Sequence, residues 1–258
     1  MGIVLLTAAA GSPGVTTSAL GLALLWPGDT VLVDVDPHPS QAVLAGYLQG
    51  SDGAGRGIAA LAGAQRQPQP ADLLAHCLPL TTETSPQRVF LPGFSRPGSQ
   101  HALAGALPGV GQALRDIDAG GSQVIMDAGR FGHEGPPRDL LGLAATVLVL
   151  TRTTLRALAA LRLHLSMINQ LAAHARVGLV LIGEGQPYTS GEIAAQFAVP
   201  VLGSVVDDAA GAAVLSEGGP VPRRFAHGRY ARSLRVLAEQ LADRDPGGAR
   251  AYPSAVAR

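Results

Sequence analysis

Seven short apolar runs, rich in β-branched residues, recur along this chain and constrain its fold more than any other feature. They cover residues 3–6, 31–33, 89–91, 124–126, 147–150, 177–182 and 201–206. Runs of this kind are typical of strands buried on both faces of a sheet. Stretches with helical periodicity separate them, such as 154–173, where leucine and isoleucine recur every three or four residues. The pattern predicts an α/β fold: a doubly wound, mostly parallel sheet of about seven to eight strands with helices on both faces.

Composition agrees with one such unit. The chain has 258 residues, of which 47% are hydrophobic, and this is enough for one substantial core. We expect a single domain over residues 1–243 and a disordered tail over 244–258, where proline and glycine are frequent. Residues 50–86 are rich in Gly, Ala, Gln and Pro, and we expect short helices there. The formal net charge is zero, so the whole molecule does not attract nucleic acid or membrane by charge alone.

The cysteine count and the N-terminal segment bear on the compartment. Cys77 is the only cysteine, so no internal disulfide can form, and no Cys/His spacing suggests a metal site. The first 28 residues carry no charged side chain, but the segment 11–14 interrupts the apolar run after about ten residues. That length is too short to span a membrane. We expect a cytoplasmic protein without a transmembrane segment.

A glycine-bearing loop, residues 9–17, joins the first apolar run to the first helical pattern. This is the position of a P-loop in nucleotide-binding proteins, between a strand and the helix that follows it. In the P-loop pattern G-x-x-x-x-G-K-[ST], backbone N–H groups surround a phosphate, the lysine binds the β/γ oxygens and the hydroxyl binds Mg²⁺. Gly14 and Thr16 are in place, whereas Val15 holds the lysine position and Ala9 that of the first glycine. The scaffold of a nucleotide site is present without its main cation.

No lysine from elsewhere can take the place of the missing ones in this loop. All 19 basic residues are arginine, so neither this chain nor an identical partner can supply a lysine. Pro13 lacks a backbone N–H, which removes one donor from a phosphate nest. An ordinary strand-to-helix turn, with threonine as N-cap, remains the alternative interpretation of the loop. The nucleotide-binding candidates are Gly11, Ser12, Gly14, Val15, Thr16 and Thr17.

Four segments, in order and spacing, resemble the MinD/ParA family of deviant Walker A ATPases. They are the loop and helix start GSPGVTT (11–17), the strand end VLVDVDP (31–37), the Walker B and switch II segment VIMDAGR (124–130) and the late strand VPVLGSVVDD (199–208). The resemblance covers most of residues 1–243. It implies the P-loop NTPase fold, ATP or ADP with Mg²⁺ as ligand, and a homodimer.

The resemblance also implies roles for individual residues. Asp36 matches the carboxylate that positions the attacking water and is the catalytic candidate. Asp127 matches the carboxylate that holds Mg²⁺ through water, with Asp34 near the metal and Thr16 as its hydroxyl ligand. Ala10 stands where the family has a signature lysine that reaches across the dimer.

The missing lysines predict a weak site. A charge-assisted hydrogen bond contributes about 1.5–3 kcal/mol, so two lost lysines weaken nucleotide binding by roughly 10²–10⁴. Hydrolysis suffers more, because charge that develops on the transferring phosphoryl group must be stabilised. We expect weak or absent ATP hydrolysis. The alternative is an active ATPase in which arginine and backbone donors replace the lysines, with Arg130 as the candidate substitute cation.

The switch II segment DAGR (127–130) is similar to that of the CpaE/TadZ-like subgroup, which localises pilus or secretion machinery. This resemblance implies a dimeric scaffold or localisation factor, also conceivable at a cell pole or septum, that binds a protein partner through its switch loops. Such a protein is peripheral at a membrane-associated machine.

Five arginines fall within thirteen residues that contain no acid, which raises a third possibility. ParA-type proteins hold DNA nonspecifically through basic surface, and such a cluster can contact phosphates. The alternative is a solvated helix face. The candidates for DNA contact are Arg223, Arg224, Arg229, Arg232 and Arg235.

Overall fold

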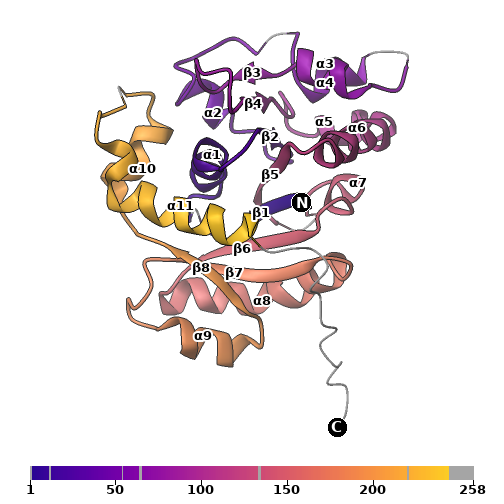
Figure 1. Cartoon of the computed structure of the whole chain (residues 1–258). Helices are drawn as coiled ribbons and strands as arrows, with labels where there is room; N and C mark the ends of the chain where they lie inside the picture. The colour runs from indigo at the N-terminus through magenta and orange to yellow at the C-terminus, as the bar shows by residue number, and fades with distance from the viewer. Residues whose placement is uncertain are drawn as a thin grey trace.

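The computed structural model describes residues 2–11, 13–53, 55–63, 66–132, 135–219 and 221–243. Its centre is an eight-stranded sheet in the order β3-β4-β2-β5-β1-β6-β7-β8 (Figure 1). The strands are β1 (Val4–Ala8), β2 (Thr30–Asp34), β3 (Leu78–Pro79), β4 (Arg88–Leu91), β5 (Gln123–Arg130), β6 (Thr146–Arg152), β7 (Arg176–Ile182) and β8 (Val201–Val205). Every neighbouring pair is parallel except β3 with β4.

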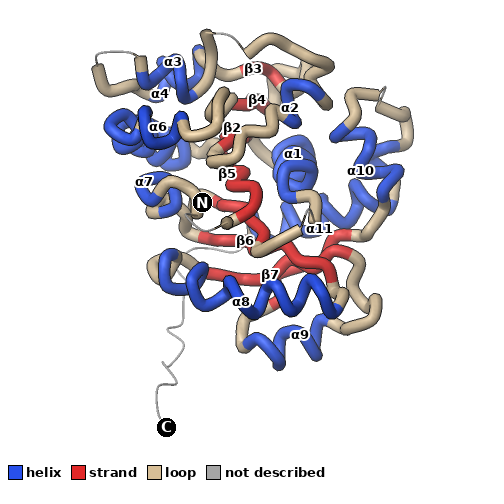
Figure 2. The backbone as a smooth tube through the Cα atoms, turned by 180° about the vertical axis from the view of Figure 1, so that it is seen from behind, coloured by secondary structure: helices blue, strands red, loops and turns tan. Residues whose placement is uncertain are grey.

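Helices connect the strands on both sides of the sheet. They are α1 (Val15–Leu25), α2 (Ala42–Ala45), α3 (Ile58–Ala62), α4 (Pro70–Ala75), α5 (Ser99–Ala102), α6 (Leu107–Ala119), α7 (Arg138–Leu141), α8 (Leu155–Leu171), α9 (Ser190–Phe197), α10 (Ala209–Ser216) and α11 (Arg229–Ala242), with 3₁₀ turns at Ala104–Ala106 and Phe225–His227. Figures 1 and 2 show α1, α10 and α11 on one face and α6, α7 and α8 on the other. No helix in the described part of the chain is both long and apolar enough to cross a membrane.

The predicted fold class is confirmed. Each of the seven apolar runs lies in a strand, and residues 50–86 contain α3 and α4 as expected. The same segment also contains β3, which the sequence did not predict. Leu78 pairs antiparallel with Phe90 of β4. The tail predicted over 244–258 lies outside the described residues.

Two apolar layers, one on each face of the sheet, explain the unbroken apolar runs. Successive residues of a strand point to opposite faces, so Leu5 packs in the layer that includes Leu161 of α8. Its neighbour Leu6 packs in the layer that includes Leu234 of α11. Leu5 and Leu6 are both fully buried. A strand covered on both faces therefore holds mostly apolar side chains, and the few polar ones, such as Thr7 and Asp127, are buried as well.

The strand order determines where a ligand can bind. β1 lies between β5 and β6, and the chain leaves it through α1 toward β2, on the far side of β5. The point where the connections diverge is the topological switch point of a doubly wound sheet. In such sheets ligands bind beyond the carboxyl ends of the strands at this point, where the loops after β1, β2 and β5 begin. The loops singled out from the sequence are therefore neighbours in space.

Candidate functional site

The loop after β1 has the backbone geometry of an anion-binding turn. Gly11 and Gly14 have φ of 75° and 87°, a left-handed conformation that favours glycine. A Cβ on either would meet no atom within 4 Å, so the conformation rather than space selects glycine here. The Gly14 carbonyl accepts the Ser18 N–H at 2.8 Å, and α1 has no side-chain N-cap. The first N–H groups of α1 are left for an external acceptor, as anion sites at helix N-termini require.

The side chains of the loop divide into a polar and an apolar part. Thr16 and Thr17 are partly buried, and the Thr16 hydroxyl is near enough to the carboxylate of Asp127 to lower its pKa. Val15 is only 6% exposed and packs in the same apolar layer as the strands. Ala10 is exposed. Ser12, the remaining nucleotide-binding candidate, lies outside the described residues.

Three carboxylates converge at the carboxyl edge of β2 and β5. Asp34 and Asp127 are directly opposite each other in the pairing of these strands. The Asp127 carboxylate accepts the Gly129 N–H at 3.0 Å, and that of Asp34 accepts the Asp36 N–H at 3.0 Å. Asp36 in turn accepts the His38 N–H at 2.8 Å. The structure thus brings Asp34 and Asp36, from one segment, next to Asp127 from another.

The cluster holds its protons more tightly than isolated carboxylates do. Burial raises the pKa of Asp127 to about 6, although the Thr16 hydroxyl and the Gly129 N–H act in the opposite direction. Desolvation and the charge of Asp127 raise the pKa of Asp34 well above its usual value. Burial also raises the pKa of Asp36. A divalent cation would relieve this concentration of buried negative charge.

Gly129, after the Walker B-like carboxylate, has a steric reason to be glycine. Its φ is 54°, and a Cβ there would overlap the carboxylate of Asp36. The hydroxyl of Thr7 in β1 donates to the Gly129 carbonyl at 3.1 Å. The C-terminal end of β5 is therefore packed against both β1 and the loop after β2.

The magnesium side of a nucleotide site fits these residues. Within the described ranges no three His, Cys, Asp or Glu side chains could hold a metal by themselves. Mg²⁺ does not need such a set, since it binds through one or two protein oxygens with phosphate and water. Thr16 and Asp127 supply those oxygens side by side. The phosphate side fits less well, because Val15 adds no charge and is turned into the core.

Arg130, the candidate substitute cation, is exposed at the end of β5. Its positive charge lowers the pKa of Asp36, after the larger effects of the His38 N–H and the His38 ring. The guanidinium is therefore close enough to act on the carboxylate cluster. In the described chain, Arg130 forms no ion pair with an acidic side chain.

An ion pair at the ends of β6 and β8 is a further feature of this edge. Arg152 pairs with Asp207 across the end of β7. Next to Arg152, the Thr153 hydroxyl forms hydrogen bonds with the carbonyl oxygens of Gly183 and Gln186, each at 2.8 Å. The sequence shows Arg152 at the end of one strand and Asp207 after another. Only the strand order reveals that these two strands, β6 and β8, are separated by β7 alone.

The arginine cluster lies on α11 and the segment before it. Arg223, Arg224 and Arg229 are exposed. Arg232 and Arg235 donate to the backbone carbonyls of the preceding 3₁₀ turn, at 3.2 and 3.0 Å. The five residues are therefore not equivalent, since two of them also hold the entry to α11.

Comparison with known proteins identifies the class of fold. A scan against protein-family models finds no match, and a search of curated proteins finds none either. Among solved structures, similarity extends to the MinD cell division protein of Aquifex aeolicus (TM-score 0.71, 10% identity, 95% of this chain and 98% of that chain). A ParA family ATPase from Chlorobium tepidum gives a TM-score of 0.72 at 13% identity over 93% and 99% of the two chains. The chain therefore has the fold of a P-loop NTPase.

A third structure narrows the class within that fold. It is the septum site-determining protein MinD of Pyrococcus horikoshii complexed with Mg-ADP, with a TM-score of 0.66 at 16% identity over 94% of this chain and 96% of that one. The variant of the P-loop NTPase fold that this protein adopts is that of the MinD and ParA ATPases.

Proposed function

We propose that this protein is a MinD/ParA-type scaffold with an eroded nucleotide site. It acts as a dimeric localisation factor for a pilus, secretion, cell-pole or septum machine, in the manner of the CpaE/TadZ-like subgroup. The observation that carries the proposal is the contrast within one site: the Thr16 hydroxyl lies near the Asp127 carboxylate, where both could serve a magnesium ion, while Val15 buries an apolar side chain at the position of the loop lysine.

The chemistry supports weak nucleotide binding by residues 1–243 acting as one unit. Backbone N–H groups of the loop and the start of α1 would hold the phosphates, and Thr16 and Asp127 would hold Mg²⁺. Bound Mg-ATP would supply the phosphoryl group and the metal charge. The chain itself adds no buried cation to the γ-phosphate, and phosphoryl transfer depends on such stabilisation. Asp36 could orient water without making the reaction fast.

Dimer formation is proposed to depend little on ATP. Ala10 occupies the position from which the family's signature lysine reaches across the dimer, and its methyl group can make no such contact. The loops after β2 and β5 then serve as a surface for a protein partner at a membrane-associated machine. Nucleotide is optional in this scheme.

Calorimetry with Mg-ATP and Mg-ADP tests the proposal directly. Two lost lysine contacts predict a Kd near millimolar, roughly 10²–10⁴ weaker than an intact site. Steady-state ATP turnover should be the same in the wild type and in Asp36→Ala, with Asp243→Ala, an exposed acid at the end of α11, as the matched control. A Kd below about 1 μM, or turnover lost only in Asp36→Ala, would overturn it.

One observation favours the active-ATPase alternative, namely the effect of Arg130 on Asp36. If Arg130 replaces the lysines, Arg130→Gln should abolish turnover while Arg138→Gln, an exposed arginine in α7, leaves it unchanged. A ParA-like DNA-binding role rests on the exposed Arg223 and Arg224. It predicts that Arg223→Ala/Arg224→Ala reduces retention on duplex DNA.

A further inference from the structure

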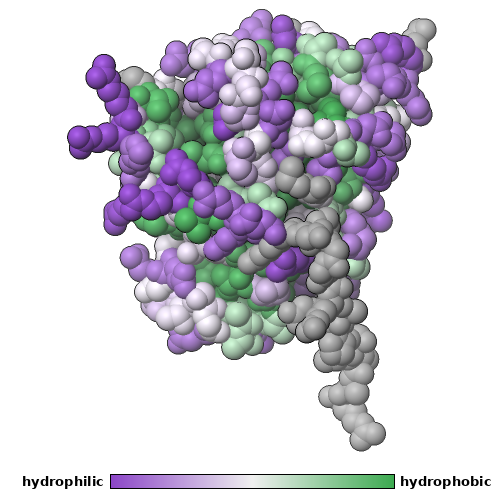
Figure 3. Space-filling model, in the orientation of Figure 1, coloured by the Kyte–Doolittle hydropathy of each residue, from purple (hydrophilic) through white to green (hydrophobic). Residues whose placement is uncertain are grey.

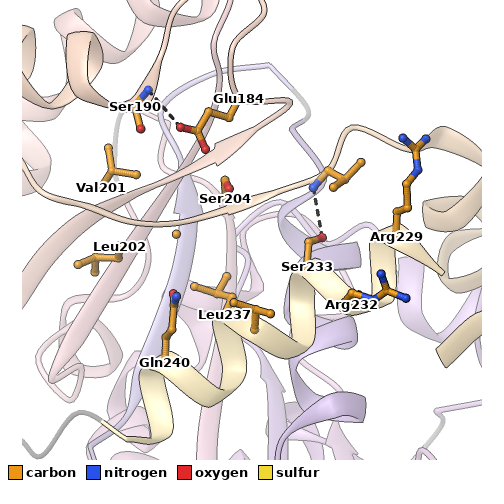
Figure 4. Close-up of a pocket in the computed structure, with 13 residues that line it drawn as sticks. Glu184, Ser190, Val201, Leu202, Ser204, Arg229, Arg232, Ser233, Leu237 and Gln240 are labelled. Atoms are coloured by element: carbon orange, nitrogen blue, oxygen red, sulfur yellow. Dashed lines mark hydrogen bonds between the residues drawn. The ribbon is translucent and has the colours of Figure 1, made fainter. Parts of the chain in front are cut away.

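One edge of the sheet is bordered by a groove distant in the strand order from the carboxylate cluster. β8 is the last strand and pairs with β7 alone. Beside it lies an open groove of about 620 Å³, bounded by β8, by α11 and by the loop that carries Glu184 and Ser190. Figure 4 shows Ser233, Leu237 and Gln240 of α11 along one side of β8, with Glu184 and Ser190 across from them. The groove follows the length of a strand.

The backbone of β8 can accept another strand. The Val205 carbonyl accepts the Gly183 N–H at 3.0 Å, so Val205 directs its backbone groups toward β7. Because these directions alternate along a strand, Ser204 turns its own N–H and C=O toward the groove. The next outward N–H, that of Val206, donates to the Ser233 hydroxyl at 3.2 Å. The edge is therefore capped at Val206 and open at Ser204, where a further strand can be added.

Positive charge gathers at one end of this groove. Arg229 and Arg232 line it and make no ion pair in the described chain. Across from them, Glu184 is already held by the Ser190 N–H at 3.3 Å and by the Ser204 hydroxyl. Glu184 keeps its negative charge but forms no ion pair with Arg229 or Arg232 in the described chain, so the two positive charges outnumber it in the groove.

The other half of the groove is apolar. Val236 is 46% exposed, one of few large hydrophobic side chains so exposed in the described chain. Val201 and Leu237 lie beside it in the same groove. Figure 3 shows hydrophilic side chains along α11 with hydrophobic patches next to them. The surface thus offers a strand edge at Ser204, an apolar contact at Val236 and two guanidinium groups without an ion pair in the described chain, of which that of Arg232 also donates to the His227 carbonyl.

We propose that this groove binds an extended acidic segment of a partner protein, which joins β8 as an additional strand. Its carboxylates pair with Arg229 and Arg232, and an apolar side chain covers Val236. A DNA duplex fits the observations less well, because the apolar half of the groove offers nothing to phosphates and a strand edge offers nothing specific to a duplex. The interaction needs no nucleotide, so it stands or falls independently of the proposed function.

Fluorescence anisotropy with the full chain and defined peptides tests this proposal. The probe is fluorescein-labelled Asp-Val-Thr-Val-Thr-Val-Asp, with acids at both ends so that either strand direction serves, and the comparison peptide has lysine at both ends. We expect the acidic peptide to bind at least about tenfold more tightly, since charge-assisted hydrogen bonds carry the difference. Arg229→Glu/Arg232→Glu should reverse this preference. Arg115→Glu/Arg162→Glu, exposed on α6 and α8, is the matched control and should not.

A second measurement separates strand addition from simple charge attraction. Backbone N-methylation of one alternating set of peptide residues should weaken binding by about tenfold or more, whereas methylation of the other set should leave it unchanged. Equal weakening by both sets, or by neither, overturns strand addition. No binding of the acidic peptide below about 1 mM overturns the proposal outright. Duplex DNA that binds through Arg229 and Arg232 when the peptide does not would assign the groove to nucleic acid instead.

Discussion

Replacing Asp127 with asparagine should make the ligand-free protein more stable at neutral and alkaline pH. Asp127 is 3% exposed and faces the carboxylate of Asp34 across the β2–β5 pairing. Asparagine has nearly the same shape and can keep the hydrogen bonds from Thr16 and Gly129. Its amide nitrogen can donate to the neighbouring acids. The substitution removes a buried charge and little else.

The size and sign of the effect follow from the pKa. Asp127 has a pKa of about 6 in the folded protein against 3.8 as the reference value. Because the folded state holds the proton more tightly, it binds more protons than the unfolded state between about pH 4 and 6, and the free energy of unfolding falls as pH rises through this window. A shift of about 2 units corresponds to roughly 3 kcal/mol, fully lost above about pH 7. Asp127→Asn should recover about 2–3 kcal/mol at pH 8 and almost nothing at pH 4.

Urea denaturation gives the measurement, with fluorescence of Trp26 as the signal. Trp26 is the only tryptophan in the chain and is buried. Curves at several pH values between 4 and 8 yield the difference between variant and wild type, and Asp243→Asn controls for loss of an exposed carboxylate. A difference that does not change with pH, or an asparagine variant less stable at pH 8, would refute the reasoning.

Two further predictions concern the same edge of the sheet. Gly129→Ala should lower the free energy of unfolding by about 1–3 kcal/mol in urea titrations, because alanine at this positive φ would displace Asp36; an unchanged midpoint would show that the turn can relax. For the Arg152–Asp207 ion pair, whose side chains are 43% and 41% exposed, a double-mutant cycle with alanine should give a coupling below about 1 kcal/mol. A coupling above about 2 kcal/mol would contradict the expected screening by solvent.

The sequence was a good guide to the strands but not to their order. Apolar runs are a local signal, and each one became a strand because both faces of the sheet are covered. β3 was missed because two residues, one of them Pro79, show no periodicity and take their conformation from pairing with β4. The position of Arg152 beside Asp207 was also not readable, since it depends on which strands are neighbours.

The candidate site divides in a similar way. The resemblance to the MinD/ParA family brought Asp34, Asp36 and Asp127 into one prediction, and the register of β2 and β5 places Asp34 opposite Asp127. The burial of Val15 was not predictable, because side-chain orientation at a helix start depends on what packs around it. The sequence singled out Arg229 and Arg232 but not the groove, because only the fold places α11, which carries both arginines and Val236, beside the free edge of β8.

The central position of β1 has a consequence for how this chain is made. β1 pairs with β5 and β6, so after it leaves the ribosome it waits for residues 123–152 before either of its edges is bonded. Pairings this far apart in sequence are slow to form, and until then the strand exposes an apolar surface that can aggregate. We therefore expect folding to be late and largely all-or-none, and chaperone protection of the nascent chain to matter most before β6 emerges.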